Sequence, residues 1–420
     1  MAIDPEEFKK RREERKLQRQ KQQRSMMIKL AVAGVVLVLC AILIVVLVAA
    51  GNRKQNPETE QTQTSQTGQT QSTQETESAE TVIHLAAAGD LNITEKVVNA
   101  GGGELSYTDT FMDVAHILAQ ADVTTVNLEG NLTGPPYGTD RSAPQTMMDA
   151  LSAAGVDLIQ LANSYSIYKG MDGLTQTVNN IRLAGMEPLG VRTAGELKTM
   201  KPYTVCNVQG VKIAFVSFTK GMDGMALPPG NEGCVNVLYA DYSTDYQTVD
   251  TEGITAILEA VEKEKPDLTV ALLHWGSEYN NTVSASQEKI CALMQELGVD
   301  AVIGTHSHYV QKMQFDPEAG TFVAYSLGDF LGDAQRSGSE YSVILDLEIT
   351  KNNETGKTRI TGYSYTPIFT VAEEEKPLRV VRIPEAMKAF EEGYIDRVSQ
   401  TSYDAMAYAL ERIKARTEAE

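Results

Sequence analysis

The chain has 420 residues and a formal net charge of −19, from 37 Lys and Arg against 56 Asp and Glu. Such a length allows about two or three domains. Because nucleic acids and anionic surfaces are bound by basic faces, this charge excludes them as main partners of the acidic part of the chain. The first 54 residues are net basic, so the remainder is more acidic than the whole and attracts cations.

Residues 30–50 form an uncharged apolar run, LAVAGVVLVLCAILIVVLVAA, behind the basic segment 1–29. As a helix at about 1.5 Å per residue, this run crosses a hydrocarbon core of roughly 30 Å. The apolar region of a cleaved signal peptide has only about 7–15 residues, which favours an uncleaved anchor. A long cleaved signal ending at Ala49-Ala50-Gly51 is the alternative. The positive-inside rule then predicts a single-pass, type II protein of the bacterial cell membrane with its C-terminal body outside.

Residues 51–81 are rich in Gln, Thr, Ser and Glu and nearly free of apolar side chains. Such a segment cannot bury enough surface to offset its chain entropy, so it is predicted to be a disordered linker. This linker would hold the following body away from the membrane surface.

From residue 82 the sequence alternates between strand-like and helix-like patterns, which predicts an α/β body over 82–384 with a parallel or mixed sheet. Strands are expected at 82–88, 123–128, 156–161, 211–218, 267–273, 299–303 and 321–327. Helices are expected at 108–119, 145–154, 172–184, 251–264 and 285–297. Two later stretches with a period of two predict antiparallel strands, and residues 385–420 predict a helical C-terminal segment.

Polar side chains follow six of the expected strands. In open α/β folds, ligands bind beyond the carboxyl ends of the strands, so these side chains are expected to meet there. The candidates are two carboxylates and three imidazoles: Asp90, Glu129, His274, His306 and His308. This mixture suits Mn, Fe or Zn ions, and two such ions that share one carboxylate could activate water.

Each of these residues also has an ordinary structural interpretation. His306 and His308 could be a hydrogen-bonded pair in a loop, Asp90 a helix cap and Glu129 a surface charge. Their recurrence at successive strand ends favours a metal site over these alternatives.

The remaining histidines and the cysteines are expected to have structural roles. His84 lies within a strand pattern and His116 within a helical one. Three cysteines in the body cannot form a complete set of disulfides. A bridge between Cys206 and Cys234 is one alternative, but buried free thiols are expected for both and for Cys291.

The motifs AAAGDLN, VNLEGNLT, LANSYSIYKGMDGL, LLHWGSEYN, GVDAVIGTHSHYVQKMQ and AYSLGDFLGD follow one another in the order and spacing found in the CapA family. Over about residues 82–335, the chain therefore resembles these capsule or poly-γ-glutamate synthesis proteins of the calcineurin-like metallophosphatase superfamily. The resemblance implies a four-layer α/β/β/α sandwich with a metal site at the strand ends. Here one transmembrane helix and the disordered linker precede it.

The resemblance also implies the roles of single residues. Asp90 matches a ligand of a first metal, Asn92 stands where related phosphatases often carry a second ligand, and Glu129 matches a carboxylate that bridges two metals. Gly304 is expected to end its strand and let the chain turn sharply toward the ligands. The histidines match the remaining ligands, with His274 and His306 for the second metal and His308 for the first.

The chain departs from the family pattern in two motifs. The usual Leu-Ala-Asn-Asn-His continues after Asn163 with Ser164 and Tyr165, which replace a metal ligand and the proton-donating histidine. Tyrosine, with an ordinary pKa near 10, is a poorer acid at neutral pH. Asp329 stands where the family has asparagine, and its charge could ligate a cation or repel a phosphate. The candidate catalytic residues are Asp90, Glu129, Asn163, Tyr165 and Asp329.

The resemblance implies a membrane-anchored, extracellular protein of capsule or poly-γ-glutamate biosynthesis or export. Its expected partners are an anionic envelope polymer, such as poly-γ-glutamate, and other synthase subunits. One class of function is a metal-dependent hydrolase that uses one or two Mn, Fe or Zn ions on a phosphoester or amide of the polymer. The other class is a non-catalytic polymer-binding or scaffold subunit of a membrane synthase complex, which the replacements Ser164 and Tyr165 favour.

Overall fold

The computed structural model describes residues 79–334, 336–373, 376–394 and 398–418, all within one compact unit. The predicted basic segment 1–29, the predicted membrane helix 30–50 and most of the predicted linker lie outside the described residues. Within the described part, no helix combines the length and the apolar character needed to cross a membrane.

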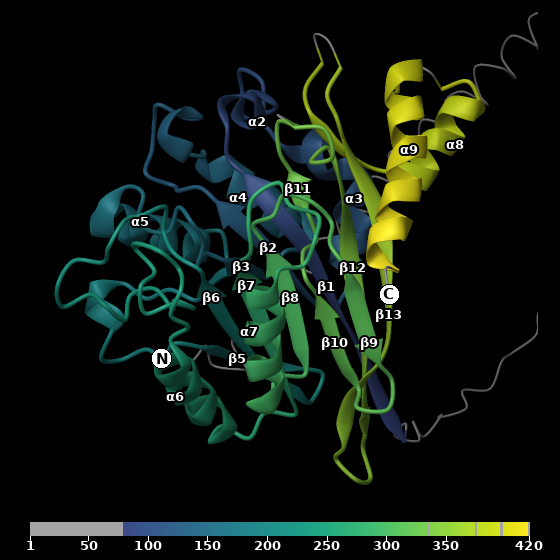
Figure 1. Ribbon diagram of the computed structural model, residues 1–420. Helices are drawn as coiled ribbons and strands as arrows, with labels where there is room; N and C mark the ends of the chain where they lie inside the picture. The colour runs from purple at the N-terminus through teal and green to yellow at the C-terminus, as the bar shows by residue number, and fades with distance from the viewer. Residues whose placement is uncertain (1–78, 335, 374–375, 395–397, 419–420) are drawn as a thin grey trace, which may run out of the picture. The chain divides into compact units, whose positions relative to one another are not determined.

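The larger sheet has eight strands in the order β14-β13-β12-β1-β2-β3-β4, with β11 paired to β1. Figure 1 shows β13, β12, β1, β2 and β3 in this order. Strands β1 to β4 are parallel, as is β11 to β1, whereas β12, β13 and β14 continue the sheet antiparallel. The sheet is therefore mixed. Its strands are β1 (Glu80–Asn92), β2 (Val123–Glu129), β3 (Leu158–Gln160), β4 (Glu187–Leu189), β11 (Asp329–Leu331), β12 (Tyr341–Asn352), β13 (Thr358–Val371) and β14 (Arg379–Arg382).

The smaller sheet has six strands in the order β5-β6-β7-β8-β10-β9. Its four central strands are parallel, and the two edge strands, β5 and β9, pair antiparallel. The strands are β5 (Thr204–Val208), β6 (Val211–Thr219), β7 (Leu268–His274), β8 (Ala301–Thr305), β9 (Met313–Asp316) and β10 (Thr321–Ala324).

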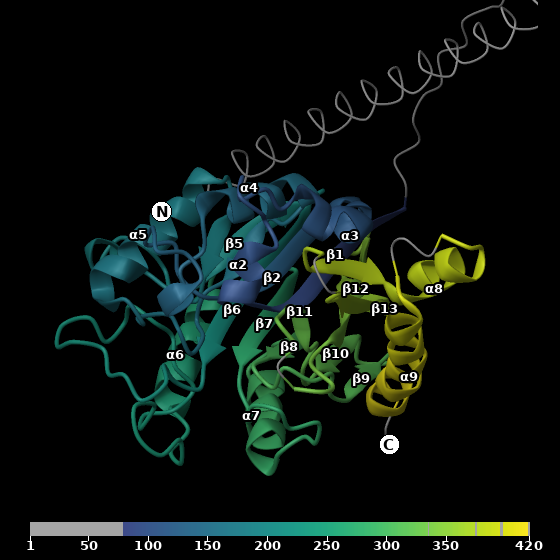
Figure 2. The ribbon, with the colours of Figure 1, turned by 90° about the horizontal axis from the view of Figure 1, so that it is seen from above.

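Helices cover the outer faces of both sheets. Figure 2 shows α3, α4 and α5 on one side of the stacked sheets and α6 and α7 on the other. On the first side lie α2 (Glu95–Asn99), α3 (Thr108–Gln120), α4 (Gln145–Ala154) and α5 (Gly170–Leu183). On the other lie α6 (Thr251–Glu262) and α7 (Ala285–Glu296). The chain also has two 3₁₀ turns, η1 (Thr139–Arg141) and η2 (Ala194–Glu196), and two C-terminal helices, α8 (Ile383–Glu391) and α9 (Gln400–Thr417).

Three hydrophobic clusters fill the spaces between these layers. One joins α3, α4 and α5 to the larger sheet, one lies between the sheets, and one joins α6 and α7 to the smaller sheet. Alternate side chains of a strand point to opposite faces, so Ile83 and Leu85 of β1 pack between the sheets. The fold is thus a mixed α/β sandwich of two sheets between two layers of helices.

The C-terminal helices belong to the same packing. Met406, Ala409 and Ile413 of α9 are buried in the cluster between the sheets. Figure 2 shows α9 beside β9, next to the edge of the smaller sheet. The helices predicted after residue 385 therefore cover the part of β12 and β13 that the smaller sheet leaves uncovered.

The structure also places the three cysteines, His84 and the start of β1. The three cysteines Cys206, Cys234 and Cys291 are buried and form no disulfide, as expected. His84 pairs with Asp346 on the neighbouring strand, which gives it a structural role. Strand β1 begins at Glu80, which pairs with β12, so the last two residues of the predicted linker lie in this strand.

Candidate metal centre

The predicted ligands come from strand ends of both sheets. Asp90 lies near the end of β1, and Glu129 and His274 are the last residues of β2 and β7. His306 and His308 follow β8 directly. Parallel strands end at a common edge, and stacking the two sheets brings these edges together.

A register shift in β1 directs Asp90 toward the smaller sheet. The pairing with β2 is irregular between Ala87 and Asp90. Before the shift, Leu85 and Ala87 face the smaller sheet, whereas Leu91 beyond it packs on the helices. Bulges of this kind often re-aim a side chain at a functional site. The Asp90 carboxylate accordingly accepts a hydrogen bond from the backbone N–H of His306, 2.9 Å away.

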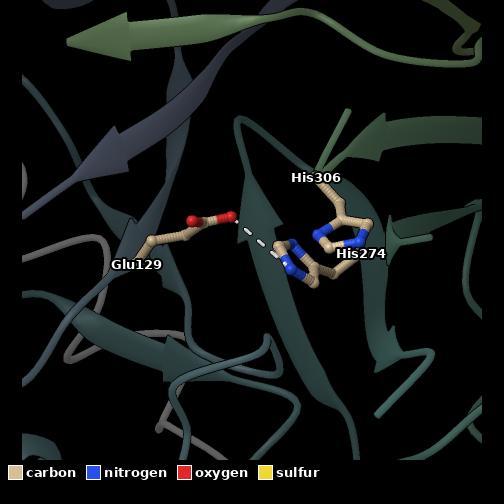
Figure 3. A group of neighbouring side chains, drawn as sticks. All are labelled: Glu129, His274 and His306. Carbon is tan, nitrogen blue, oxygen red and sulfur yellow. Dashed lines mark ion pairs between the residues drawn. The ribbon is translucent and has the colours of Figure 1, made fainter. Parts of the chain in front are cut away.

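One group of potential ligands joins Glu129 to His274 and His306. All three side chains are buried, and one ligand atom from each lies within 4.8 Å of the others. Figure 3 shows the two imidazoles side by side, facing the carboxylate. Glu129 Oε1 is 3.5 Å from His274 Nε2, and the two ring centroids are 4.4 Å apart.

A second group joins the same Glu129 to Asp90 and His308. Its ligand atoms also lie within 4.8 Å of one another, and all three residues are buried. His308 Nδ1 is 3.8 Å from Asp90 Oδ2 and 2.7 Å from Asp329 Oδ1. Glu129 is the member shared by both groups, the position expected of a carboxylate that bridges two ions.

Two buried atoms of these groups lack a hydrogen-bond partner in the described structure. They are Glu129 Oε1 and His306 Nε2. Polar atoms in a protein interior are nearly always bonded, and each exception calls for an explanation. Both atoms are suited to divalent Mn, Fe or Zn by their chemistry. The residues present therefore fit a metal ion, which would bond these two atoms.

The pKa values of the buried carboxylates also favour a bound cation. Burial raises the pKa of Asp90 to about 7, although His308 opposes the rise. Burial, and then the negative charge of Asp90, raises the pKa of Glu129 well above its ordinary value. Burial also raises the pKa of Asp329 against the effect of His308. Three buried carboxylates are thus short of positive charge, which a cation would supply.

The imidazoles divide into two kinds. Burial lowers the pKa of His274 and of His306 well below the ordinary value, so both stay neutral, the form that binds metals. Burial alone would lower the pKa of His308 too. The neighbouring carboxylates of Asp329, Glu129 and Asp90 outweigh burial and raise this pKa well above the ordinary value.

The turn after β8 differs from the expectation for Gly304. This glycine does not end the strand but lies inside β8, and its φ is not positive. The positive φ values belong to His306, at 87°, and His308, at 59°. Such values are uncommon outside glycine and are found at functional sites. Gly304 is needed for close packing instead, because a Cβ there would lie 1.9 Å from the Tyr325 carbonyl oxygen.

Asn92 and Asn163, two predicted site residues, form side-chain hydrogen bonds within the protein. Asn92 Oδ1 accepts a hydrogen bond from Arg141 Nη1. Asn163 Nδ2 donates to Asn127 Oδ1 and to the Leu128 carbonyl oxygen, at 3.0 and 2.6 Å. Asn163 Oδ1 accepts from the Tyr165 N–H at 2.9 Å. Asn163 therefore positions its loop against β2.

The two substituted positions lie beside the ligands. Ser164 Oγ is 3.1 Å from His274 Nε2, the nitrogen that also faces Glu129. The Tyr165 hydroxyl accepts a hydrogen bond of 2.8 Å from Arg141 Nη2. Burial raises the pKa of Tyr165 above its ordinary value, so the phenol stays protonated at neutral pH.

Two further site residues, Asn127 and Arg141, were not predicted. Asn127 Nδ2 donates to Asp90 Oδ1 at 2.6 Å, so it orients this carboxylate. Its signal was available, because it precedes Glu129 by two residues and so shares one face of β2. Arg141 follows a Gly- and Pro-rich stretch typical of a surface turn, and its sequence alone gave no signal.

Comparison with known proteins agrees with the motifs. Residues 84–334, more than half of the chain, match the family described as bacterial capsule synthesis protein PGA_cap. A capsule biosynthesis protein CapA of Bacillus anthracis is 27% identical over 218 residues, 50% of this chain and 48% of that protein. The chain thus spans about half the length of this relative. The PGA biosynthesis protein CapA of Bacillus subtilis is 23% identical over 72% of this chain and 78% of its own length.

Solved structures show more distant likenesses. A novel phosphatase from Mycoplasma pneumoniae superposes with a TM-score of 0.43 at 14% identity, over 69% of this chain and 94% of its own. A sulfate thiohydrolase SoxB from Thermus thermophilus gives a TM-score of 0.35 at 13% identity, over 75% of this chain and 49% of its own. On the family match, the chain belongs to the bacterial capsule synthesis protein family PGA_cap, with the CapA proteins among its relatives.

Proposed function

We propose that this protein is a metal-dependent hydrolase of capsule or poly-γ-glutamate biosynthesis or export, acting on a phosphoester or amide bond of the polymer. The observation that carries this proposal is the pair of ligand groups sharing Glu129, with the unbonded atoms Glu129 Oε1 and His306 Nε2. Divalent ions bound there would supply Lewis-acid polarisation of a phosphoryl or carbonyl oxygen and activation of a water molecule.

The residues around the ligands have defined tasks in this proposal. Asn127 and the His306 N–H orient the two oxygens of Asp90. Asp329 orients His308 through its 2.7 Å contact, as carboxylates often do for metal-binding histidines. The burial of all these groups lowers the local dielectric, which strengthens each electrostatic interaction.

The cellular setting is part of the proposal. The apolar run 30–50 and the basic segment before it support a single-pass anchor with the body outside the bacterial cell membrane. In that place the body would meet an anionic envelope polymer as it is made, released or attached. Other synthase subunits in the membrane are the expected neighbours.

A second function is favoured by the geometry at two positions. Ser164 contacts His274 Nε2, and the Tyr165 hydroxyl, whose pKa is raised, accepts a hydrogen bond from Arg141. Neither residue supplies an acid with a pKa near neutrality. These contacts support a non-catalytic subunit that binds polymer or organises a synthase while still holding metal.

The test measures hydrolysis of bis(p-nitrophenyl) phosphate by the purified full-length chain supplied with Mn, Fe and Zn. Turnover that disappears in His308→Ala and persists in His84→Ala supports the hydrolase. Background turnover in wild-type protein that binds metal, with activity gained in the double variant Ser164→Asn/Tyr165→His, supports the non-catalytic subunit. Wild-type protein without metal contradicts both functions.

A further inference from the structure

The guanidinium of Arg141 is held beside the metal centre by neutral groups only. Nη1 donates to Asn92 Oδ1 and, at 3.4 Å, to the Ile93 carbonyl oxygen. Nη2 donates to the Tyr165 hydroxyl at 2.8 Å, and Cζ lies 4.3 Å from the centre of the Tyr165 ring. The side chain is half-buried and its orientation is fixed on two sides.

Arg141 has no carboxylate partner among the described residues. The protein has 56 acidic side chains against 37 basic ones, so partners were available. Arg182, which is also half-buried, does have such partners, Glu187 and Glu196. An arginine fixed in place and left without a countercharge is suited to an anion that arrives from solution.

The charge of Arg141 reaches the metal centre. Burial raises the pKa values of Glu129 and Asp329, and the positive charge of Arg141 is among the influences that oppose both rises. The contacts give the same position, because Arg141 Nη2 bonds the Tyr165 hydroxyl at 2.8 Å, and the neighbouring Ser164 Oγ lies 3.1 Å from His274 Nε2.

Two more cations without an ion pair in the described residues flank the centre. Lys220 Nζ donates to the Gly276 carbonyl oxygen at 2.9 Å, and its charge contributes, after burial, to lowering the pKa of His306. Arg336 is exposed and lies 4.1 Å from the centre of the Tyr279 ring, which is itself 5.0 Å from the His308 ring. In an acidic protein, three unpaired cations around one site favour negatively charged ligands.

We propose that Arg141, oriented by Asn92 and Tyr165, binds an anionic oxygen group of the substrate, a carboxylate or a phosphate, beside the metal centre. The planar guanidinium matches both groups in its two-point hydrogen-bonding geometry. Tyr165 then positions this binding group and does not act as an acid. This inference rests on the proposed function, because the anionic group belongs to the substrate that reaches the metal centre.

The test measures binding of inorganic phosphate and of a short γ-linked glutamate oligomer to the Mn-supplied full-length chain by calorimetry. Arg141→Gln is expected to weaken the binding of at least one of them by roughly tenfold or more, as for loss of a charged hydrogen bond. Loss for the oligomer alone assigns a carboxylate, and loss for phosphate alone assigns a phosphoryl group. Arg359→Gln is the control, because it removes the same charge from an exposed position of β13. Arg359 pairs with Thr350, at the end of β12 that lies away from the site, so this variant should change neither affinity.

Metal content and thermal unfolding are measured on the same samples. Arg141→Gln protein with normal metal content and both affinities within twofold of wild type overturns the role of Arg141 alone. Wild-type protein without metal overturns the proposed function and this inference with it. If Arg141→Gln does not fold, Arg141→Lys replaces it. That variant keeps the charge but loses the planar fork, and anion binding equal to wild type would overturn the inference.

Discussion

At the end of β2, Glu129 has a carboxylate oxygen that no described residue bonds, and it lies close to the carboxylate of Asp90. With Asp329, three buried carboxylates share His308 as their nearest favourable charge. Such crowding costs stability in the metal-free protein, as is common where side chains are placed for a ligand. At the scale of single residues, this cost is what distinguishes a metal centre from a structural hydrogen-bond network.

Glu129→Gln should therefore stabilise the metal-free protein. Glutamine keeps the size of the side chain and removes its charge. Because the pKa of Glu129 is raised in the folded state, wild-type protein loses stability as pH rises above the ordinary pKa of glutamate. The gain in unfolding free energy, about 1 kcal/mol or more, should be larger at pH 8 than at pH 5.

Thermal unfolding of chelator-treated protein at both pH values measures this difference. The exposed Glu278→Gln is the matched control and should leave the melting temperature unchanged. A lower melting temperature for Glu129→Gln than for wild type at pH 8 would contradict the described crowding of charges.

The site residues could be predicted from the sequence where their chemical type was informative. Asp90 and Glu129 follow predicted apolar strands, and three of the five histidines follow two further predicted strands. Arg141 could not be predicted, because its contact with Tyr165 depends on how its loop folds back over β1 and β2. Asn92 was predicted to be a metal ligand, but the sequence could not show that the Arg141 guanidinium donates to its side-chain oxygen.

At the scale of elements, the long strands and the helices carry their own periodic patterns and could be predicted. Strands β4 and β11 have three residues each and, unlike the equally short β3, lie in no longer apolar run; they form because a neighbouring strand offers pairing. Strand β8 was predicted to break at Gly304 because glycine is usually a turn residue. Its role in packing depends on the distance to β10, which the sequence does not contain.

Gly304→Ala tests how closely these elements must approach. The added Cβ would lie 1.9 Å from the Tyr325 carbonyl oxygen and 2.4 Å from Trp275 Nε1, so β8 or the end of β10 must shift. We expect a loss of unfolding free energy of about 2 kcal/mol or more, together with weaker metal binding, because His306 follows two residues later. Chemical denaturation measures the first effect and metal titration the second.

Gly103→Ala is the matched control for this variant. No atom lies within 4 Å of a Cβ added at Gly103, and its φ is not positive. Its unfolding free energy should stay within about 0.5 kcal/mol of wild type. Equal stabilities for the two alanine variants would show that β8 tolerates a side chain at Gly304.

At the scale of the whole molecule, the proposed anchor and the acidic body imply one orientation in the cell. The full-length chain should sediment with bacterial membranes, and protease added outside intact protoplasts should digest the body. A chain without residues 1–54 should stay in the soluble fraction. Full-length chain in the soluble fraction, or a body protected from external protease, would contradict the proposed anchor.

The proposed function requires metal bound between the two sheets. Elemental analysis of the full-length chain, purified with Mn, Fe and Zn supplied and then dialysed, measures this quantity. We predict about two divalent ions per wild-type chain, as for a site with a shared carboxylate, and loss of most of this metal in Glu129→Gln but not in Glu278→Gln. Wild-type protein free of metal, or Glu129→Gln protein with undiminished metal, would contradict the proposed metal centre.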